Sequence, residues 1–115
     1  MSKDCVFCRI AEGRGPARIV YQDEDVVAIE DISPQAPHHY LIIPRLHIPT
    51  VMDLDGAPQG LSDRIMSAAR RIAIDKGFAE EGFRLVINCN HHGGQTVWHL
   101  HVHLLAGRHL SWPPG

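Results

Sequence analysis

The alternation of apolar and polar residues predicts a mainly antiparallel β-sheet with few helices. Short apolar runs rich in β-branched residues, each ended by polar residues, proline or glycine, are typical of strands. The polar stretch 22–25 between the first two runs predicts a β-hairpin. The predicted strands lie at residues 18–21, 26–30, 40–44, 83–88 and 97–105.

A different period, typical of a helix, follows at residues 61–77. Its apolar residues recur on one stripe with arginines and Asp75 between them, and Gly77 suits the C-cap. Residues 47–58 are expected to form a loop or a short helix. We therefore predict the α+β class, with about five antiparallel strands, one long and one short helix, and a single domain over 1–115.

Composition narrows the environment and the partners. Hydrophobic residues make up 44% and charged residues 21% of the 115-residue chain, and its formal net charge is −2. There is no basic excess to attract a nucleic-acid polymer, and no apolar run long enough to cross a membrane or resembling a signal peptide. We expect a cytoplasmic protein whose three cysteines are thiols or metal ligands rather than disulfides.

The most informative stretch places His99, His101 and His103 at alternate positions of the last predicted strand. Side chains two residues apart lie on the same face, roughly 6.6 Å from each other, and the intervening apolar residues point into the core. Such a row can hold a catalytic metal, or one imidazole can act as a nucleophile. The wide spacing along one strand disfavours a single ion bound by all three.

The preceding stretch, residues 91–96, favours the nucleophile. Its glycine N–H groups, the amide of Gln95 and the hydroxyl of Thr96 are neutral donors suited to the non-bridging oxygens of a phosphate. A paired glycine alone more often marks a plain turn. Next to a histidine row, it indicates phosphate chemistry.

The sequence His-Leu-His-Val-His-Leu-Leu at 99–105 resembles the motif of the histidine triad superfamily at all seven positions. Collinear blocks elsewhere resemble its nucleotide-binding branch, often called Hint. Thr96 and Trp98 depart from that pattern, where serine and often tyrosine stand. These blocks lie at residues 31–37, 41–48, 84–88, 93–108 and 112–115.

The resemblance implies a homodimeric purine nucleoside phosphoramidase and nucleotidyl hydrolase. His101 corresponds to the family's nucleophile, which attacks the α-phosphorus of an adenosine 5'-phosphoramidate or aminoacyl adenylate and later releases AMP. A dinucleoside polyphosphate hydrolase would use the same histidine with another leaving group. A nucleotide-binding interaction module, with the C-terminal segment as its docking element, is the non-catalytic alternative.

The resemblance also assigns the remaining site residues. His103 would donate to phosphate together with Asn88 and the donors of residues 94–96, His39 would orient the nucleophile, and Asp31 would bind ribose hydroxyls. From the residues alone, Asp31 could equally cap its loop, and the apolar members could be ordinary core. The expected nucleotide-binding set is Asp31, Ile32, Phe7, Ile10, Ile29, Asn88, Gly94, Gln95, Thr96, Val97 and Trp112, with His99, His101, His103 and His39 catalytic.

Some members of the family bind a structural zinc ion near the N-terminus. The corresponding residues here are Cys5, Cys8, His47 and His99, a Cys₂His₂ set typical of closed tetrahedral sites. The alternative is a pair of reduced thiols in the N-terminal segment. In either case, we expect no cofactor for catalysis.

Overall fold

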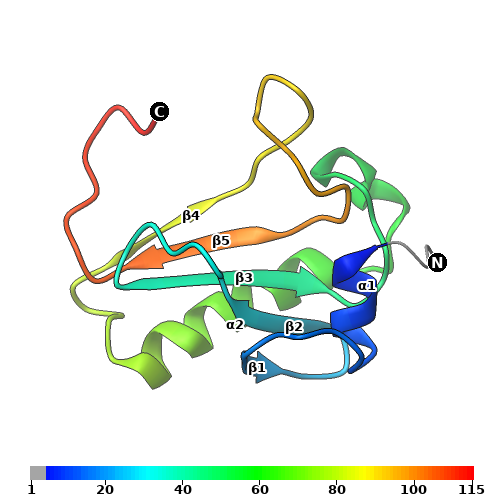
Figure 1. The fold of residues 1–115 in the computed structure, drawn as a ribbon, viewed down its shortest axis with the longest axis horizontal. Coiled ribbons are helices and arrows are strands. Elements are labelled where there is room, and N and C mark those ends of the chain that lie inside the picture. Colours follow the sequence, from blue (N-terminus) through cyan, green and yellow to red (C-terminus); the bar gives the residue numbers. More distant parts are fainter. Residues whose placement is uncertain (1–4) are drawn as a thin grey trace.

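The computed structural model describes residues 5–115, which fold around one five-stranded antiparallel sheet (Figure 1). The strands lie side by side in the order β1-β2-β3-β5-β4, so the predicted α+β class is confirmed. In chain order the elements are α1 (Val6–Ala11), β1 (Ile19–Gln22), β2 (Val26–Glu30), β3 (His38–Pro44), the 3₁₀ helix η1 (Val51–Gly56), α2 (Leu61–Lys76), β4 (Phe83–Val86) and β5 (Val102–Ala106).

The predicted hairpin is formed by β1 and β2, and the side chain of Asp23 shapes its turn. Its Oδ1 accepts hydrogen bonds from the backbone N–H groups of Asp25 at 2.8 Å and Val26 at 2.9 Å. Such carboxylate-to-backbone bonds explain why a short polar stretch reverses the chain here. β3 then pairs with β2 from Val26↔Pro44 to Glu30↔Tyr40.

The long helix α2 covers one face of the sheet (Figure 1). Its apolar stripe packs on inward-facing strand residues, and Gly77 ends it in the left-handed region at φ 83°. Both observations confirm the predicted amphipathic helix. Leu100, Val102 and Leu104 point into this same core, as their alternation with the histidines predicts.

The other face of the sheet is covered by the short helix α1 (Figure 1), which builds a second, smaller core. This second layer explains why His99 and His101 are buried although they lie opposite the main core, at 0% and 9% exposure. His99 and His101 therefore lie between the sheet and α1, where both rings contact Phe7. The buried members of this core are Phe7, Ile10, Val27, Ile29, Leu41 and Ile43.

The last strand is shorter than expected, because β5 begins only at Val102 and not near residue 97. Its pairing with β3 reaches Ile42↔Val102, and two residues further along the same register Leu100 would face Pro44, which has no N–H to donate. Leu100 instead donates its N–H to the carbonyl of Ile48 at 2.6 Å. His99 and His101 therefore lie on irregular backbone, and only His103 belongs to a strand.

Among residues 5–115, no helix combines the length and apolar character needed to span a membrane.

Candidate active site

His101 is held in one tautomer by the backbone that precedes it. Its Nδ1 lies 2.9 Å from the carbonyl oxygen of His99, and a carbonyl can only accept, so Nδ1 carries the hydrogen. In the neutral ring, Nε2 then carries the lone pair. The ring of Phe7 contacts the imidazole edge-on, with centroids 5.1 Å apart, and helps to fix its orientation. His101 is thus a preoriented imidazole whose neutral form carries its lone pair on Nε2.

A second chain of hydrogen bonds fixes His39 and His103. The backbone N–H of Gln35 donates to Nδ1 of His39 at 3.0 Å, so the hydrogen of the neutral His39 ring is on Nε2. That Nε2 lies 2.9 Å from Nδ1 of His103 and donates to it. Nδ1 of His103 is therefore an acceptor, and its Nε2–H remains to be offered to a ligand.

The electrostatic environment keeps His103 neutral. Burial is the main cause that lowers its pKa to about 4, and the neighbouring His101 and His39 lower it further, while Asp31 opposes the shift. Burial also lowers the pKa of His39, again against the effect of Asp31. At neutral pH, His103 therefore offers an uncharged N–H donor.

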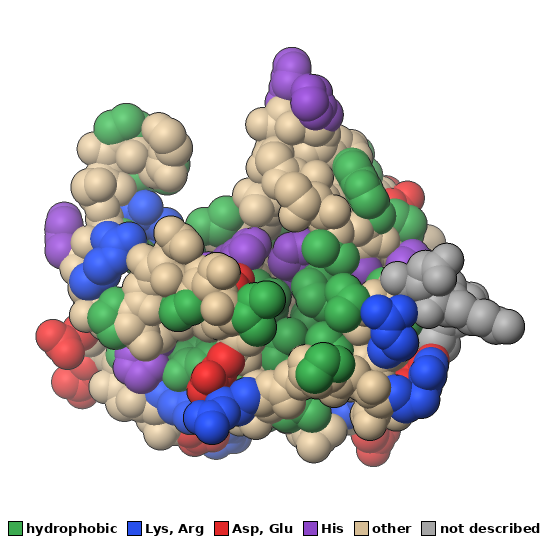
Figure 2. All heavy atoms as spheres, viewed as in Figure 1, with side chains coloured by type: hydrophobic (Ala, Val, Ile, Leu, Met, Phe, Trp, Pro, Cys, Tyr) green, Lys and Arg blue, Asp and Glu red, His purple; other side chains and the backbone are tan. Residues whose placement is uncertain are grey.

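Beside the imidazoles lies an apolar groove with a volume of about 700 Å³. Figure 2 shows histidine and hydrophobic side chains together in a hollow on this face of the molecule. Four residues that the resemblance implies for an apolar base pocket, Phe7, Ile10, Ile29 and Ile32, line the groove. Ile32 is 97% exposed at its rim, whereas the other three also belong to the smaller core. Its lining includes Phe7, Ile10, Ile29, Asp31, Ile32, Leu41, Thr96 and Val97.

Asp31 lies where the groove meets the histidines. One carboxylate oxygen accepts a hydrogen bond from the N–H of Ser33 at 2.8 Å, and the other lies 3.4 Å from Nε2 of His39. The loop-capping role of Asp31 is thus confirmed, and its binding of ribose hydroxyls stays a prediction. Asp31 shapes its loop and lines the groove.

The loop between β4 and the histidines differs from the expected cradle of donors. Gln95 is buried, and its Nε2 donates to the carbonyls of Pro49 at 2.7 Å and Val97 at 3.1 Å. The N–H of Gly94 donates to the carbonyl of His91 at 3.0 Å. These hydrogens hold the loop together instead of pointing toward a ligand.

Both glycines of this loop are needed for its shape. Gly94 adopts φ 78°, and a Cβ on Gly93 would lie 2.5 Å from the backbone oxygen of Cys89. Asn88 remains near the site, with Nδ2 3.5 Å from Nε2 of His103. Thr96 is exposed beside the groove. Trp112 is 81% exposed and does not line the groove of its own chain.

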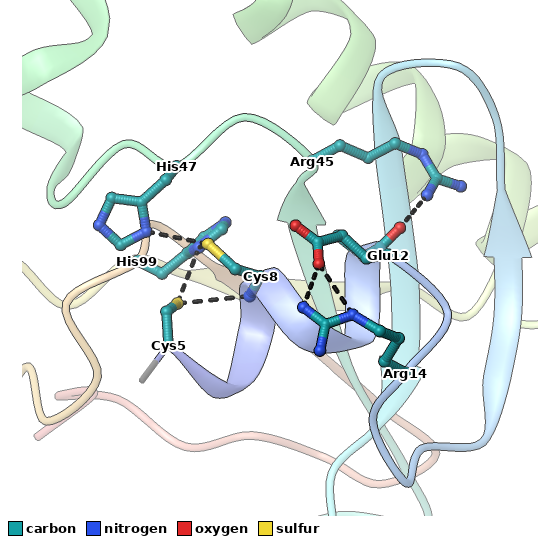
Figure 3. Close-up of polar contacts among 8 residues, drawn as sticks. Cys5, Cys8, Glu12, Arg14, Arg45, His47 and His99 are labelled. Atoms are coloured by element: carbon teal, nitrogen blue, oxygen red, sulfur yellow. Dashed lines mark hydrogen bonds and ion pairs between the residues drawn. The ribbon is translucent and has the colours of Figure 1, made fainter. Parts of the chain in front are cut away.

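His99 faces away from the other two triad histidines, toward two cysteines. Its Nε2–H donates to the carbonyl of Pro44 at 2.7 Å, which leaves Nδ1 as the free acceptor. That Nδ1 lies 3.3 Å from Sγ of Cys5 and 3.6 Å from Sγ of Cys8, and Nδ1 of His47 lies 3.2 Å from Sγ of Cys8 (Figure 3). All four ligand atoms lie within 4.8 Å of one another.

This cluster fits a tetrahedral metal ion. With Zn–S bonds of about 2.3 Å and Zn–N bonds of about 2.0 Å, ligand atoms of a tetrahedral site lie roughly 3.3–3.8 Å apart. Burial lowers the pKa of His99, which keeps its ring in the neutral form that a metal requires. The chemistry of the donor set and the direction of the His99 lone pair both suit zinc.

The sequence does not show which backbone groups define each tautomer. These are the N–H of Gln35 and the carbonyls of Pro44 and His99. The predicted site also missed Leu41 in the groove. The alternation of β3 could have placed Leu41 on the face of His39, but no sequence signal identifies a particular main-chain carbonyl as a partner.

A preoriented imidazole, a second imidazole that offers an N–H, and an apolar groove beside them on this fold are the features of the histidine triad class. Residues 4–112 match the family model described as "Scavenger mRNA decapping enzyme C-term binding". The chain belongs to the histidine triad family of hydrolases.

The chain is also similar to individual proteins of this family. The chain is 48% identical over 111 residues to a protein of Escherichia coli K12 named purine nucleoside phosphoramidase, covering 96% of this chain and 93% of that protein. A crystal structure of a HIT family hydrolase from Legionella pneumophila superposes with a TM-score of 0.93 at 47% identity, covering 97% of this chain and 100% of the other. A zinc-bound histidine triad protein from Mycobacterium smegmatis superposes at 0.79, with 33% identity and coverage of 91% and 76%.

Proposed function

We propose that the protein is a purine nucleoside phosphoramidase that cleaves adenosine 5'-phosphoramidates and aminoacyl adenylates and releases AMP. Its high identity to the Escherichia coli phosphoramidase over nearly the whole chain supports this activity. The observation that carries the chemistry is the 2.9 Å contact between Nδ1 of His101 and the carbonyl of His99, which places a hydrogen on Nδ1, so that the lone pair of the neutral ring is on Nε2.

In the first step, the Nε2 lone pair of His101 attacks the α-phosphorus. For a phosphoramidate, a bond forms between Nε2 and phosphorus, the phosphorus–nitrogen bond breaks, and the amine leaves after taking up a proton from solvent. For an aminoacyl adenylate, the bond between phosphorus and the carboxyl oxygen breaks instead, and the carboxylate leaves. An imidazole is nucleophilic near neutral pH without prior deprotonation, so a covalent intermediate replaces one difficult step by two easier ones. The preset tautomer of His101 avoids any rearrangement before the attack.

In the second step, water attacks the same phosphorus, the bond between Nε2 and phosphorus breaks, and AMP leaves while a proton of the water passes to solvent, which regenerates the neutral imidazole. Negative charge on the phosphate oxygens grows in both transition states, and a fixed donor there stabilises it. The Nε2–H of His103 supplies this donor through the bond that fixes its Nδ1 as an acceptor. Asn88 lies beside that nitrogen, and Thr96 lies at the groove, so both are within the same region.

The nucleoside occupies the apolar groove. Phe7, Ile10 and Ile29 offer a surface for the purine, and the carboxylate of Asp31 at the rim accepts hydrogen bonds from the ribose hydroxyls. Phe7 both lines the groove and contacts the ring of His101, so a purine packed on Phe7 would lie close to the reacting imidazole.

A zinc ion held by Cys5, Cys8, His47 and His99 is the second part of the proposal. The Cys₂His₂ donor set and the zinc-bound Mycobacterium smegmatis relative support it. When bound, zinc would tie the segment of α1 to the sheet, and all four of its positions would be filled by protein, so none is open for substrate. No catalytic cofactor is needed for the two displacements at phosphorus.

The covalent intermediate provides the test. Wild-type protein quenched during turnover of adenosine 5'-phosphoramidate should gain the mass of one adenylyl group, with fragmentation locating it on His101. His101→Ala should form no adduct and lose turnover while still binding AMP. The matched control is His109→Ala, at an exposed histidine outside the groove, which should behave as wild type. An active His101→Ala variant would refute the assignment.

The same assay distinguishes the proposed phosphoramidase from a dinucleoside polyphosphate hydrolase and from an interaction module. A dinucleoside polyphosphate hydrolase would turn over diadenosine polyphosphates faster than the phosphoramidate, whereas the proposed enzyme should prefer the phosphorus–nitrogen bond. An interaction module would bind AMP without forming any adduct.

A further inference from the structure

One wall of the groove is formed by the helix α1, which is too short to be stable without contacts to the rest of the protein. α1 has six residues, Val6–Ala11, and carries both Phe7 and Ile10 on its buried side. Isolated helices of this length are unstable in water, so their position depends on tertiary contacts. Whatever holds α1 therefore determines where the apolar wall meets the nucleoside.

The N-terminal end of α1 is held by the cysteine–histidine cluster. Cys5 caps the helix by accepting a hydrogen bond from the N–H of Cys8 at 3.3 Å, and both thiols contact His99. His47 contacts the second thiol from the segment that follows β3. A zinc ion in this cluster would fix only this end of the helix.

The C-terminal end is held by Arg45, two residues before His47 (Figure 3). Its Nη1 donates to the carbonyl of Ala11 at 2.5 Å, one of the carbonyls that an α-helix leaves without an internal partner. A cation at this end also interacts favourably with the helix dipole. The segment after β3 thus contacts both ends of α1: the imidazole of His47 contacts the N-terminal end and the guanidinium of Arg45 the C-terminal end.

The same guanidinium is anchored on the hairpin, so it cannot move freely with α1. Its Nε donates to the carbonyl of Asp23 at 2.8 Å, and its Nη2 donates to Oε1 of Gln22 at 3.0 Å. Three acceptors on two elements use the planar donor geometry that distinguishes arginine from lysine. The side chain is therefore a rigid brace between the β1–β2 turn and α1. It does not line the groove.

We propose that Arg45 is a positioning residue that sets the affinity of the groove for the nucleoside through α1. It holds the end of the helix nearest Ile10, and the cysteine–histidine cluster holds the end nearest Phe7. Loss of the brace lets the wall move away from the base without disturbing His101. This inference rests on the proposed function, because it assumes that a purine nucleoside occupies the groove.

The test compares Arg45→Met with wild type by calorimetric binding of AMP and of adenosine. Removing a charged hydrogen-bond network at the helix end should weaken both ligands about five- to tenfold. Adenosine is essential to the design, because loss of a positive charge could weaken AMP alone through its phosphate. In turnover, KM should rise by a similar factor with kcat at saturation retained, a separation that a general loss of folding would not produce.

Two further variants sharpen the comparison. Arg14→Met removes an arginine that follows α1; its side chain is 60% exposed and pairs with Glu12 (Figure 3), so this variant should bind both ligands as wild type does. Arg45→Lys keeps the charge without the three-way geometry, so its affinity should lie between those of the Arg45→Met variant and wild type. If Arg45→Met folds poorly, Arg45→Lys carries the same prediction in a milder form.

The possible outcomes distinguish failure of the positioning role of Arg45 from failure of the proposed function. Unchanged adenosine binding in both Arg45 variants, or a loss confined to AMP, overturns the positioning role and leaves the proposed function standing. Failure of the wild-type protein to bind AMP or adenosine overturns both proposals together. Metal content should be the same in wild type and Arg45→Met, and its loss in the variant would place the effect at the cluster instead of at the brace.

Discussion

His39 and His103 are joined by a hydrogen bond of 2.9 Å from Nε2 of the first to Nδ1 of the second. The direction of this bond is set one step earlier, by the backbone N–H of Gln35 that occupies Nδ1 of His39. A single main-chain donor thus determines that His103 presents its Nε2–H on the far side of the ring. We expect His39 to act on the substrate through this neighbour and not by contacting the nucleophile His101 as the resemblance implies.

Removing His39 should therefore lower kcat with little effect on AMP binding. In His39→Ala, Nδ1 of His103 loses its donor, and the ring is no longer held in the tautomer that offers Nε2–H; a loss of about 10–100-fold is expected. His39→Gln can donate from its amide and should recover part of the rate. Steady-state kinetics with adenosine 5'-phosphoramidate measure both, and equal rates in His39→Ala and wild type would contradict the relay.

The buried histidines should make the fold sensitive to acid. The pKa of His103 is lowered from 6.5 to about 4, so between these values the unfolded chain binds more protons than the folded one. Stability therefore rises with pH across this window, is fully present above about 6.5, and falls as the pH is lowered toward 4. The urea concentration at the midpoint of unfolding should therefore decrease as the pH is lowered from 7.5. The lowered pKa values of His39 and His99 act in the same direction.

His103→Gln supplies the control for this pH dependence, since it removes one of the titrating groups. Its urea midpoint should vary less steeply with pH than that of wild type at the same metal loading. Identical slopes in the two proteins would assign the acid sensitivity to other groups.

Chelation tests the cysteine–histidine cluster. Protein purified without a histidine tag should contain about one zinc ion per chain, and its removal should lower Tm by roughly 10 °C or more, because binding energy at a structural site is folding energy. Cys8→Ser should contain little zinc and respond little to the chelator. Cys89→Ser changes a cysteine outside the cluster and should retain the metal. Metal-free wild-type protein would rule out the site.

Gly15 is predicted to be essential for the groove although it does not line it. An added Cβ would lie 2.5 Å from Cγ1 of Ile10, so Gly15→Ala must displace that side chain or the loop. Overpacking of this kind costs about 1–3 kcal/mol and should weaken AMP binding several-fold. Gly56→Ala, where a Cβ meets nothing within 4 Å, should leave AMP affinity unchanged. A Gly15→Ala variant with wild-type affinity and stability would show that Ile10 yields without cost.

A homodimer is the expected assembly. β4 is an edge strand, and Phe83 and Ile87 at and just beyond it are 36% and 40% exposed, which leaves an apolar edge that pairing between copies would cover. Sedimentation should give twice the chain mass of 12.8 kDa. A monomer at micromolar concentration would contradict this expectation. It would also contradict the binding of nucleotide by Trp112 of the partner subunit, the role that the resemblance implies for this exposed residue.

Several elements follow from sequence periodicity because local physics decides them. The stripe of α2 with its glycine cap and the polar turn of the hairpin were predictable in this way. So was the inward alternation of Leu100, Val102 and Leu104. The residue at which β5 begins was not predictable, because it depends on which residue of β3 lies opposite Leu100. That residue is Pro44, which lies 56 positions earlier in the chain.

By itself the sequence determined the class of fold, the histidine motif and the residue types available for phosphate and metal chemistry. Only the tertiary structure decided which partners each imidazole has and therefore which ring nitrogen carries the hydrogen. His99 donates to Pro44 and faces the thiols, His101 donates to the carbonyl of His99, and His103 accepts from His39. These partners are main-chain groups and distant side chains, brought to the rings by folding, so alternation along one strand could not tell the three histidines apart.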